Sequence, residues 1–259
     1  MPKFERDGVS IHYDVAGEGP ALLLSHGYSA TAEMWRGQVL ALSKAYKLIT
    51  WDMRGHGRSD YPDDPAAYSE AATVADMAAV LDAVGAKRAI VGGLSLGGYM
   101  SLAFHLAHRD RVRGLLIVDT GPGYKNDQAR EAWNKSAIRT AERYETEGLG
   151  RLAAGSPEMR TSHHRNADGL ARAARGMLTQ RDARVISSLP AVTVPTLVVV
   201  GADDAPFLAA SDYMVAKIPG AKKVVIEGAG HAANIDQPEA FNAAILRFLA
   251  EAGLDRPTG

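Results

Sequence analysis

The chain has 259 residues, a formal net charge of −1 at pH 7 and no cysteine. This length suits one large α/β domain with room for an insertion. The near-neutral charge gives no bulk attraction to nucleic acid or to an anionic membrane, so we expect neither as a partner. The absence of cysteine excludes disulfides, thiolate metal sites and a cysteine nucleophile.

The N-terminal residues are polar and lack the apolar core of a signal peptide. No apolar run in the sequence approaches the roughly 18 residues that a membrane-spanning helix needs. We therefore expect a soluble, cytoplasmic protein that is a monomer or a homodimer.

Strands are predicted to alternate with helices through the first half of the chain. Asp7-Gly8 is a strong turn signal inside an alternating stretch, so residues 4–15 are predicted to form a β-hairpin. Short continuous apolar runs predict buried strands at 21–25, 46–51, 88–92 and 112–118. Helices are predicted between them at 34–44, from the candidate N-cap Ser69 to a stop at Gly85, and at 96–108.

The alternation stops at residue 121, and the stretch to about residue 190 has helical periodicity without a strand pattern. It resumes with a strand at 196–200, a helix at 209–218, a strand at 223–226 and a closing helix at 238–252. This order predicts a doubly wound, mostly parallel sheet of about eight strands. Residues 1–120 and 191–259 are predicted to form the core, and residues 121–190 a helical cap inserted after the sixth strand.

The most informative motif is Gly93-Leu94-Ser95-Leu96-Gly97, which fits the G-x-S-x-G pattern of a nucleophile elbow. A serine in a tight strand-to-helix turn needs neighbours without a Cβ two residues away on each side, because the backbones crowd together there. The turn lifts the Ser95 hydroxyl clear of the sheet. The N-terminus of the following helix then favours negative charge that develops beside it.

A serine hydroxyl needs a base to attack an acyl carbon at neutral pH, and the base needs an orienting acid. His231 follows the last predicted strand, in a loop that Gly228 and Gly230 allow to turn sharply. Asp203 and Asp204 both follow the preceding strand. The chain order is therefore Ser, Asp, His, and all three lie at the carboxyl ends of strands, where open α/β sheets place their sites.

The chain resembles the α/β-hydrolase superfamily from the first hairpin to the final helix. Four motifs carry the resemblance: the oxyanion loop His26-Gly27-Tyr28, the loop from Asp52 to Ser59, the elbow at 93–98 and the histidine loop Gly230-His231. The resemblance implies an α/β-hydrolase fold, and a triad whose acid lies three residues after the glycine that ends the strand. That spacing favours Asp204 over Asp203, with Asp119 as a further alternative.

By the same resemblance, the backbone N–H groups of Tyr28 and Leu96 would form the oxyanion hole. The implied function is a serine hydrolase that cleaves a small or medium carboxylic ester or lactone through an acyl-enzyme on Ser95. Carbon–carbon bond hydrolases, cofactor-free haloperoxidase- or perhydrolase-like members and hydroxynitrile lyases remain alternatives within the superfamily. A receptor that keeps the hydrolase shell is the alternative from another class.

We expect no cofactor and no metal ion. The adjacent His163 and His164 point apart on a helix or strand, and no carboxylate cluster accompanies them. Trp133 in the cap and Phe207, just after the acid, are candidate substrate-binding residues. Tyr144, Met159 and Met177 could line an acyl pocket too, although their spacing is equally typical of packing within the cap.

Overall fold

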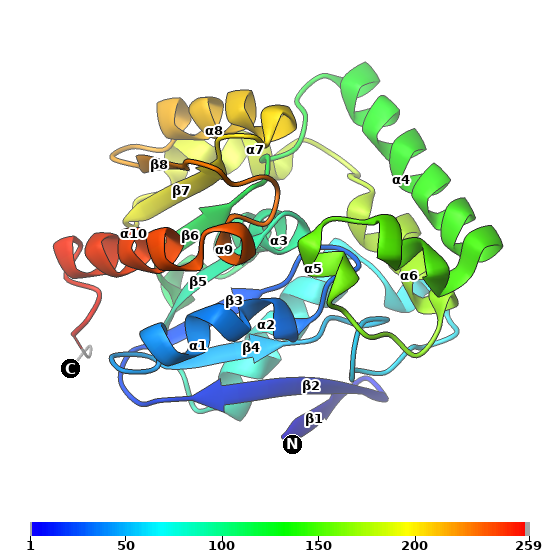
Figure 1. Ribbon diagram of the computed structural model, residues 1–259, viewed down its shortest axis with the longest axis horizontal. Helices are drawn as coiled ribbons and strands as arrows, with labels where there is room; N and C mark the ends of the chain where they lie inside the picture. Colours follow the sequence, from blue (N-terminus) through cyan, green and yellow to red (C-terminus); the bar gives the residue numbers. More distant parts are fainter. Residues whose placement is uncertain (1, 257–259) are drawn as a thin grey trace.

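The computed structural model describes residues 2–256, which form one mixed sheet with helices on both faces (Figure 1). The sheet has eight strands in the order β1-β2-β4-β3-β5-β6-β7-β8. β2 pairs antiparallel with β1 and β4, and the remaining neighbours are parallel. The prediction of a mostly parallel sheet of about eight strands is therefore confirmed. The strands are β1 (Lys3–Arg6), β2 (Val9–Ala16), β3 (Ala21–Ser25), β4 (Lys47–Trp51), β5 (Ala89–Leu94), β6 (Val112–Val118), β7 (Thr196–Gly201) and β8 (Lys222–Ile226).

The helices of the core form two layers, one on each face of the sheet (Figure 1). α2, α3 and α8 cover one face, and α1 and α10 cover the other. Two separate apolar clusters fill the spaces between sheet and helices. The core helices are α1 (Arg36–Leu42), α2 (Glu70–Ala83), α3 (Leu96–Ala107), α8 (Ala205–Lys217), α9 (Ala233–Asp236) and α10 (Pro238–Glu251).

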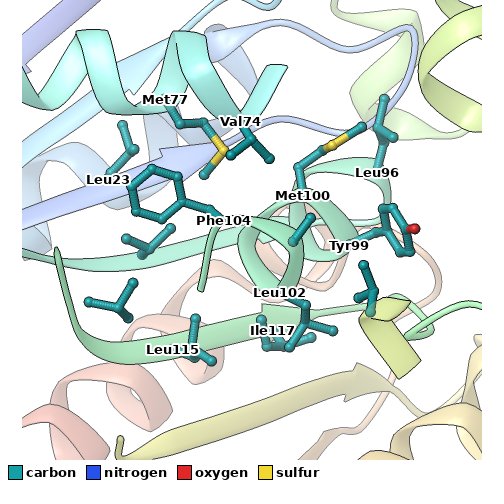
Figure 2. Packing of buried hydrophobic residues seen from close by; sticks show 14 of the residues in the cluster. Leu23, Val74, Met77, Leu96, Tyr99, Met100, Leu102, Phe104, Leu115 and Ile117 are labelled. Atoms are coloured by element: carbon teal, nitrogen blue, oxygen red, sulfur yellow. The ribbon is translucent and has the colours of Figure 1, made fainter. Parts of the chain in front are cut away.

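Successive side chains of a strand point to opposite faces of the sheet, so a strand that is buried on both faces needs a continuous apolar run. On β3, Leu23 belongs to the cluster under α2 and α3, whereas Leu22 and Leu24 belong to the cluster under α1 and α10. Figure 2 shows the first cluster, in which Phe104 of α3 and Met77 of α2 meet side chains of the sheet. Both faces of β3 are therefore packed against apolar clusters, which requires a continuous apolar run from Ala21 to Leu24.

The turn and cap signals that the sequence contains are used as predicted. Asp7 and Gly8 have φ values of 52° and 71°, which is the left-handed turn that joins β1 to β2. The Ser69 hydroxyl accepts the N–H of Ala72 at 3.1 Å and caps α2. Gly85, with φ of 69°, follows the end of that helix.

Two predicted helix boundaries need correction, and one short helix has no counterpart among the predicted elements. The helix predicted at 34–44 is a short 3₁₀ turn, Ala32–Trp35, followed by α1. α8 begins at Ala205 rather than near residue 209, because Pro206 suits the first turn of a helix, where its missing N–H has no partner to lose. The short helix α9 lies directly after the histidine loop and has no periodic signal in the sequence.

Between β6 and β7, every element of regular secondary structure that the described residues form is a helix or a helical turn. This segment arches over the carboxyl ends of the strands in Figure 1 and has a small apolar cluster of its own, which includes Tyr144 and Leu170. Its helices are α4 (Asp127–Glu147), α5 (Pro157–Arg160), α6 (Ala167–Ala173) and α7 (Arg184–Ser188). We refer to residues 121–190 as the cap. The division of the chain into a core and an inserted cap domain stays a prediction.

The glycines on either side of Ser95 stand where backbones approach closely. A Cβ at Gly93 would lie 2.5 Å from the carbonyl carbon of Gly97, and a Cβ at Gly97 would collide with the carbonyl oxygen of Ser25 on β3. Neither obstacle is a flexible side chain, so neither can give way easily. The helix tolerates its two N-terminal glycines because only glycine fits between α3 and the neighbouring strands.

We predict that Gly97→Ala lowers the free energy of unfolding by about 3 kcal/mol, because overpacking against fixed backbone forces the sheet and helix apart. Gly150→Ala is the matched control, since a Cβ there meets nothing within 4 Å. Urea unfolding followed by circular dichroism measures both. Equal stability of the two variants would show that the elbow backbone is not tightly packed.

Candidate active site

Ser95 stands at the turn between β5 and α3 in a strained backbone conformation. Its φ and ψ are 54° and −115°, a combination that residues with a side chain rarely adopt. Two hydrogen bonds hold this conformation: the N–H of Ser95 donates to the carbonyl of Val118 at 2.9 Å, and its carbonyl accepts the hydroxyl of Thr120 at 2.7 Å. Ser95 therefore lies at the carboxyl end of the central strand β5, directly before the N-terminus of α3.

The imidazole of His231 is paired with Asp204. Its Nδ1 lies 2.9 Å from Oδ2 of Asp204, whose side chain is 5% exposed. Asp203 is exposed, and its backbone N–H donates to the carbonyl of Ala229. The acid that faces the imidazole is therefore Asp204, while the backbone of Asp203 ties the end of β7 to the histidine loop.

Several charges set the pKa of His231. Burial lowers it, but the hydrogen bond and the negative charge of Asp204 raise it by more, with further contributions from Glu158 and Asp119. The pKa of His231 therefore lies above its ordinary value of 6.5. Glu158 was not predicted from the sequence: it lies on α5 of the cap, which packs against α9, and it is 3% exposed.

Asp119, the alternative acid, has other partners. Its carboxylate accepts the N–H of Gly201 at 2.8 Å and that of Ala233 at 3.3 Å. Burial is the main cause that raises its pKa to about 7. Asp119 thus joins the end of β7 to the start of α9. Asp204 follows the first of these two segments in the sequence, and His231 precedes the second.

The loop that follows β3 lies beside the elbow, because β3 and β5 are neighbours in the sheet. A Cβ at Gly27 would lie 3.6 Å from the Cβ of Ser95, so the loop after β3 passes within van der Waals distance of the nucleophile candidate. Tyr28 directly follows Gly27, and Leu96 directly follows Ser95 as the first residue of α3.

Cap residues hold Ser29, the residue after Tyr28, in a left-handed conformation with φ of 60°. The carbonyl of Ser29 accepts hydrogen bonds from the Ser162 hydroxyl at 2.9 Å and from Nε2 of His164 at 3.0 Å. Its own hydroxyl accepts that of Tyr144 at 2.8 Å. Tyr144, Ser162 and His164 therefore anchor the loop of Tyr28 to the cap, a role that the sequence did not predict for any of them.

His164 keeps one tautomer in this arrangement. Its Nδ1 accepts the N–H of Gly57 at 3.1 Å, so the proton is on Nε2, which donates to Ser29. Burial is the main reason that its pKa falls to about 4. His163, its neighbour in the sequence, is 89% exposed. Among residues 2–256, no group of three or more His, Asp or Glu side chains could hold a metal ion.

A cavity of about 100 Å³ opens beside Ser95. Both substrate-binding candidates line it, Trp133 from α4 and Phe207 from α8. Phe207 also stacks on the imidazole of His231, with the ring centroids 5.2 Å apart. The cavity is therefore bounded by the serine, by the cap and by the aromatic ring that covers the histidine.

A family model described as "Alpha/beta hydrolase family" matches residues 22–244. The chain belongs to this family. A 3-oxoadipate enol-lactonase of Acinetobacter baylyi is 28% identical over 257 residues, which cover 91% of each chain. A proposed 2-succinyl-6-hydroxy-2,4-cyclohexadiene-1-carboxylate synthase of Bacillus subtilis is 27% identical over 94% of this chain and 96% of its own.

Among solved structures, a thermophilic esterase from Thermogutta terrifontis superposes with a TM-score of 0.81 at 30% identity, over 96% of this chain and 97% of its own. These similarities extend through the cap as well as the core. Within the part of the hydrolase that the structure describes, no helix has both the length and the apolarity that a bilayer crossing requires.

We predict that Glu158→Gln lowers the pKa of His231, because it removes a buried negative charge that favours the imidazolium. An NMR titration of the histidine ring signals measures this directly and needs no substrate. Glu145→Gln is the matched control, since it removes the same charge from an exposed cap residue that pairs with Arg175 at 2.9 Å. An unchanged His231 pKa in Glu158→Gln would mean that the two groups do not interact.

Proposed function

We propose that this hydrolase cleaves a small carboxylic ester or lactone through an acyl-enzyme on Ser95, with His231 as base and Asp204 as the orienting acid. The observation that carries the proposal is the His231–Asp204 pair, whose Nδ1 and Oδ2 atoms lie 2.9 Å apart. The imidazole stacks on Phe207, which lines the same small cavity as the strained Ser95. The names of the enol-lactonase and the esterase among its relatives support the choice of carbonyl substrates.

In the proposed reaction, Nε2 of His231 takes the Ser95 proton as Oγ forms a bond to the carbonyl carbon. The carbonyl oxygen becomes an oxyanion and accepts the backbone N–H groups of Tyr28 and Leu96. His231 then returns the proton to the leaving alcohol as the C–O bond breaks. A water activated by His231 hydrolyses the acyl-enzyme in the same way and restores Ser95. Asp204 stabilises the imidazolium in both halves of the cycle.

The contacts of the cap with Ser29 support the oxyanion assignment. A donor stabilises the transition state only if it is already aimed at the position where charge develops, and each such donor is typically worth about 3–4 kcal/mol. The hydrogen bonds from Tyr144, Ser162 and His164 fix the residue directly after Tyr28. The hydroxyl of Tyr28 itself donates to the carbonyl of Leu170 in the cap at 2.8 Å.

The proposal predicts that Ser95→Ala and His231→Ala each lower kcat by about 10⁴- to 10⁶-fold, because both residues act as one unit. Asp204→Asn is expected to lower it by about 10⁴-fold, since the histidine loses its orienting charge. Asp203→Asn is the matched control and is expected to keep most of the activity. The assay is a panel of p-nitrophenyl esters and lactones, together with covalent labelling by a fluorophosphonate.

Labelling of wild type and of Asp203→Asn, but not of Ser95→Ala, is the expected pattern. Labelling that persists in Ser95→Ala would place the nucleophile elsewhere. A protein that binds esters without releasing acid or alcohol would favour the receptor alternative.

The pH dependence of kcat/KM follows from the raised pKa of His231. The imidazole must be neutral to act as base, so we expect activity to be lost as the pH falls through a midpoint above 6.5. Activity should reach its plateau on the alkaline side of that midpoint. A profile that is flat from pH 5 to pH 8 would contradict the role of His231 as the base.

A further inference from the structure

The cavity beside Ser95 contains one buried polar side chain that no proposed catalytic step uses. This is Gln180, which is 8% exposed and lines the cavity. Its amide oxygen Oε1 is buried and accepts no hydrogen bond from any residue in the described range 2–256. The other side chains that line the cavity are mostly apolar or aromatic: Tyr99, Trp133, Met177, Leu178, Phe207 and Ala210.

The backbone, and not the amide, holds Gln180 in place. Its N–H donates to Oδ1 of Asn134 at 2.8 Å, and Nδ2 of Asn134 donates back to its carbonyl at 2.9 Å. The adjacent Trp133 donates to the carbonyl of Leu178 at 2.7 Å. Hydrogen bonds with Trp133 and Asn134 therefore fix the backbone at Leu178 and Gln180, and none of them uses the side chain of Gln180.

Gly123, which also lines the cavity, leaves room for the amide. Gly123 has φ of 91°, and a Cβ there would lie 2.9 Å from Oε1 of Gln180. A buried amide without a partner destabilises the folded protein, whereas an apolar side chain of the same size at this position would not. Gln180 lines the cavity, so an unpaired amide at this position is best explained by a partner that arrives with the substrate.

We propose that Gln180 binds a polar group of the substrate, so that the preferred esters or lactones carry a hydroxyl or amide N–H in the part that fills this cavity. The inference rests on the proposed function and narrows its substrate class. An amide oxygen accepts from such a group, and an amide turned by 180° about its last bond would instead donate to an ether or carbonyl oxygen. The cavity volume of about 100 Å³ suits a small group in this part of the substrate.

The test compares matched ester pairs in the wild type and in Gln180→Met. Methionine is unbranched, apolar and close to glutamine in size, and the backbone hydrogen bonds to Asn134 do not depend on the side chain. One pair varies the acyl group, p-nitrophenyl butanoate against its β-hydroxy derivative. A second pair varies the alcohol, propyl butanoate against the glycol monoester. The methyl ether of each hydroxyl substrate distinguishes an accepting amide from a donating one.

We expect wild type to prefer the hydroxyl or ether member of at least one pair by about tenfold in kcat/KM, a typical effect of one neutral hydrogen bond. Gln180→Met should reduce that ratio to near one and leave the unsubstituted ester hydrolysed. Met177→Leu is the control variant: it alters the same cavity without changing its polarity, so the ratio should persist. We also expect Gln180→Met to unfold at the same or a higher temperature than wild type, which a purely structural glutamine would not allow.

Equal kcat/KM for both members of every pair in wild type would overturn the inference, and so would a preference that survives in Gln180→Met. Either result leaves the proposed function intact as long as the unsubstituted esters are hydrolysed in a Ser95-dependent reaction. Failure of all esters, together with failure of fluorophosphonate labelling, would instead contradict the proposed function itself.

Discussion

The backbone of Ser95 turns sharply between β5 and α3, and this turn is possible only because glycines let three elements approach one another. Gly97 lies against the carbonyl of Ser25 on β3, and Gly93 lies against the first turn of α3. A side chain at either position would push the helix away from the sheet. The elbow, the loop after β3 and the N-terminus of α3 are brought together by this close approach, so the geometry of the candidate site follows from it.

The other half of the candidate site lies on the loops after β7 and β8. The close glycine contacts at the elbow do not hold these loops in position. Asp119 at the end of β6 does this instead, through hydrogen bonds to Gly201 and to Ala233. A buried carboxylate is expensive to keep charged, which agrees with the raised pKa of Asp119 of about 7. Asp119 is hydrogen-bonded to both loops and not to the imidazole, so its part in the candidate site is to hold the two loops together.

The cap covers the candidate site, and its residues also contribute hydrogen bonds and charge to it. It supplies the hydrogen bonds that hold Ser29, the buried charge of Glu158 near His231 and the amide of Gln180 in the cavity wall. Tyr144 and Ser29 are 115 residues apart in the sequence, so these contacts exist only after the cap has docked. Substitutions in the cap are therefore able to change the chemistry as well as the choice of substrate.

Local patterns in the sequence determined most of the fold and proposed the residues of the candidate site. The dipeptide Asp7-Gly8, the apolar strands and the spacing of glycines around Ser95 are short-range signals, and each predicted the element that the structure contains. The tertiary structure decided what depends on distant partners. Asp203 and Asp204 are neighbours with the same side chain, and only the packing of β7 against the histidine loop buries one and exposes the other. Glu158, His164 and Gln180 have no sequence signal, because an acid, an imidazole or an amide in a helical region is usually solvated, and only the docked cap shows what each one faces.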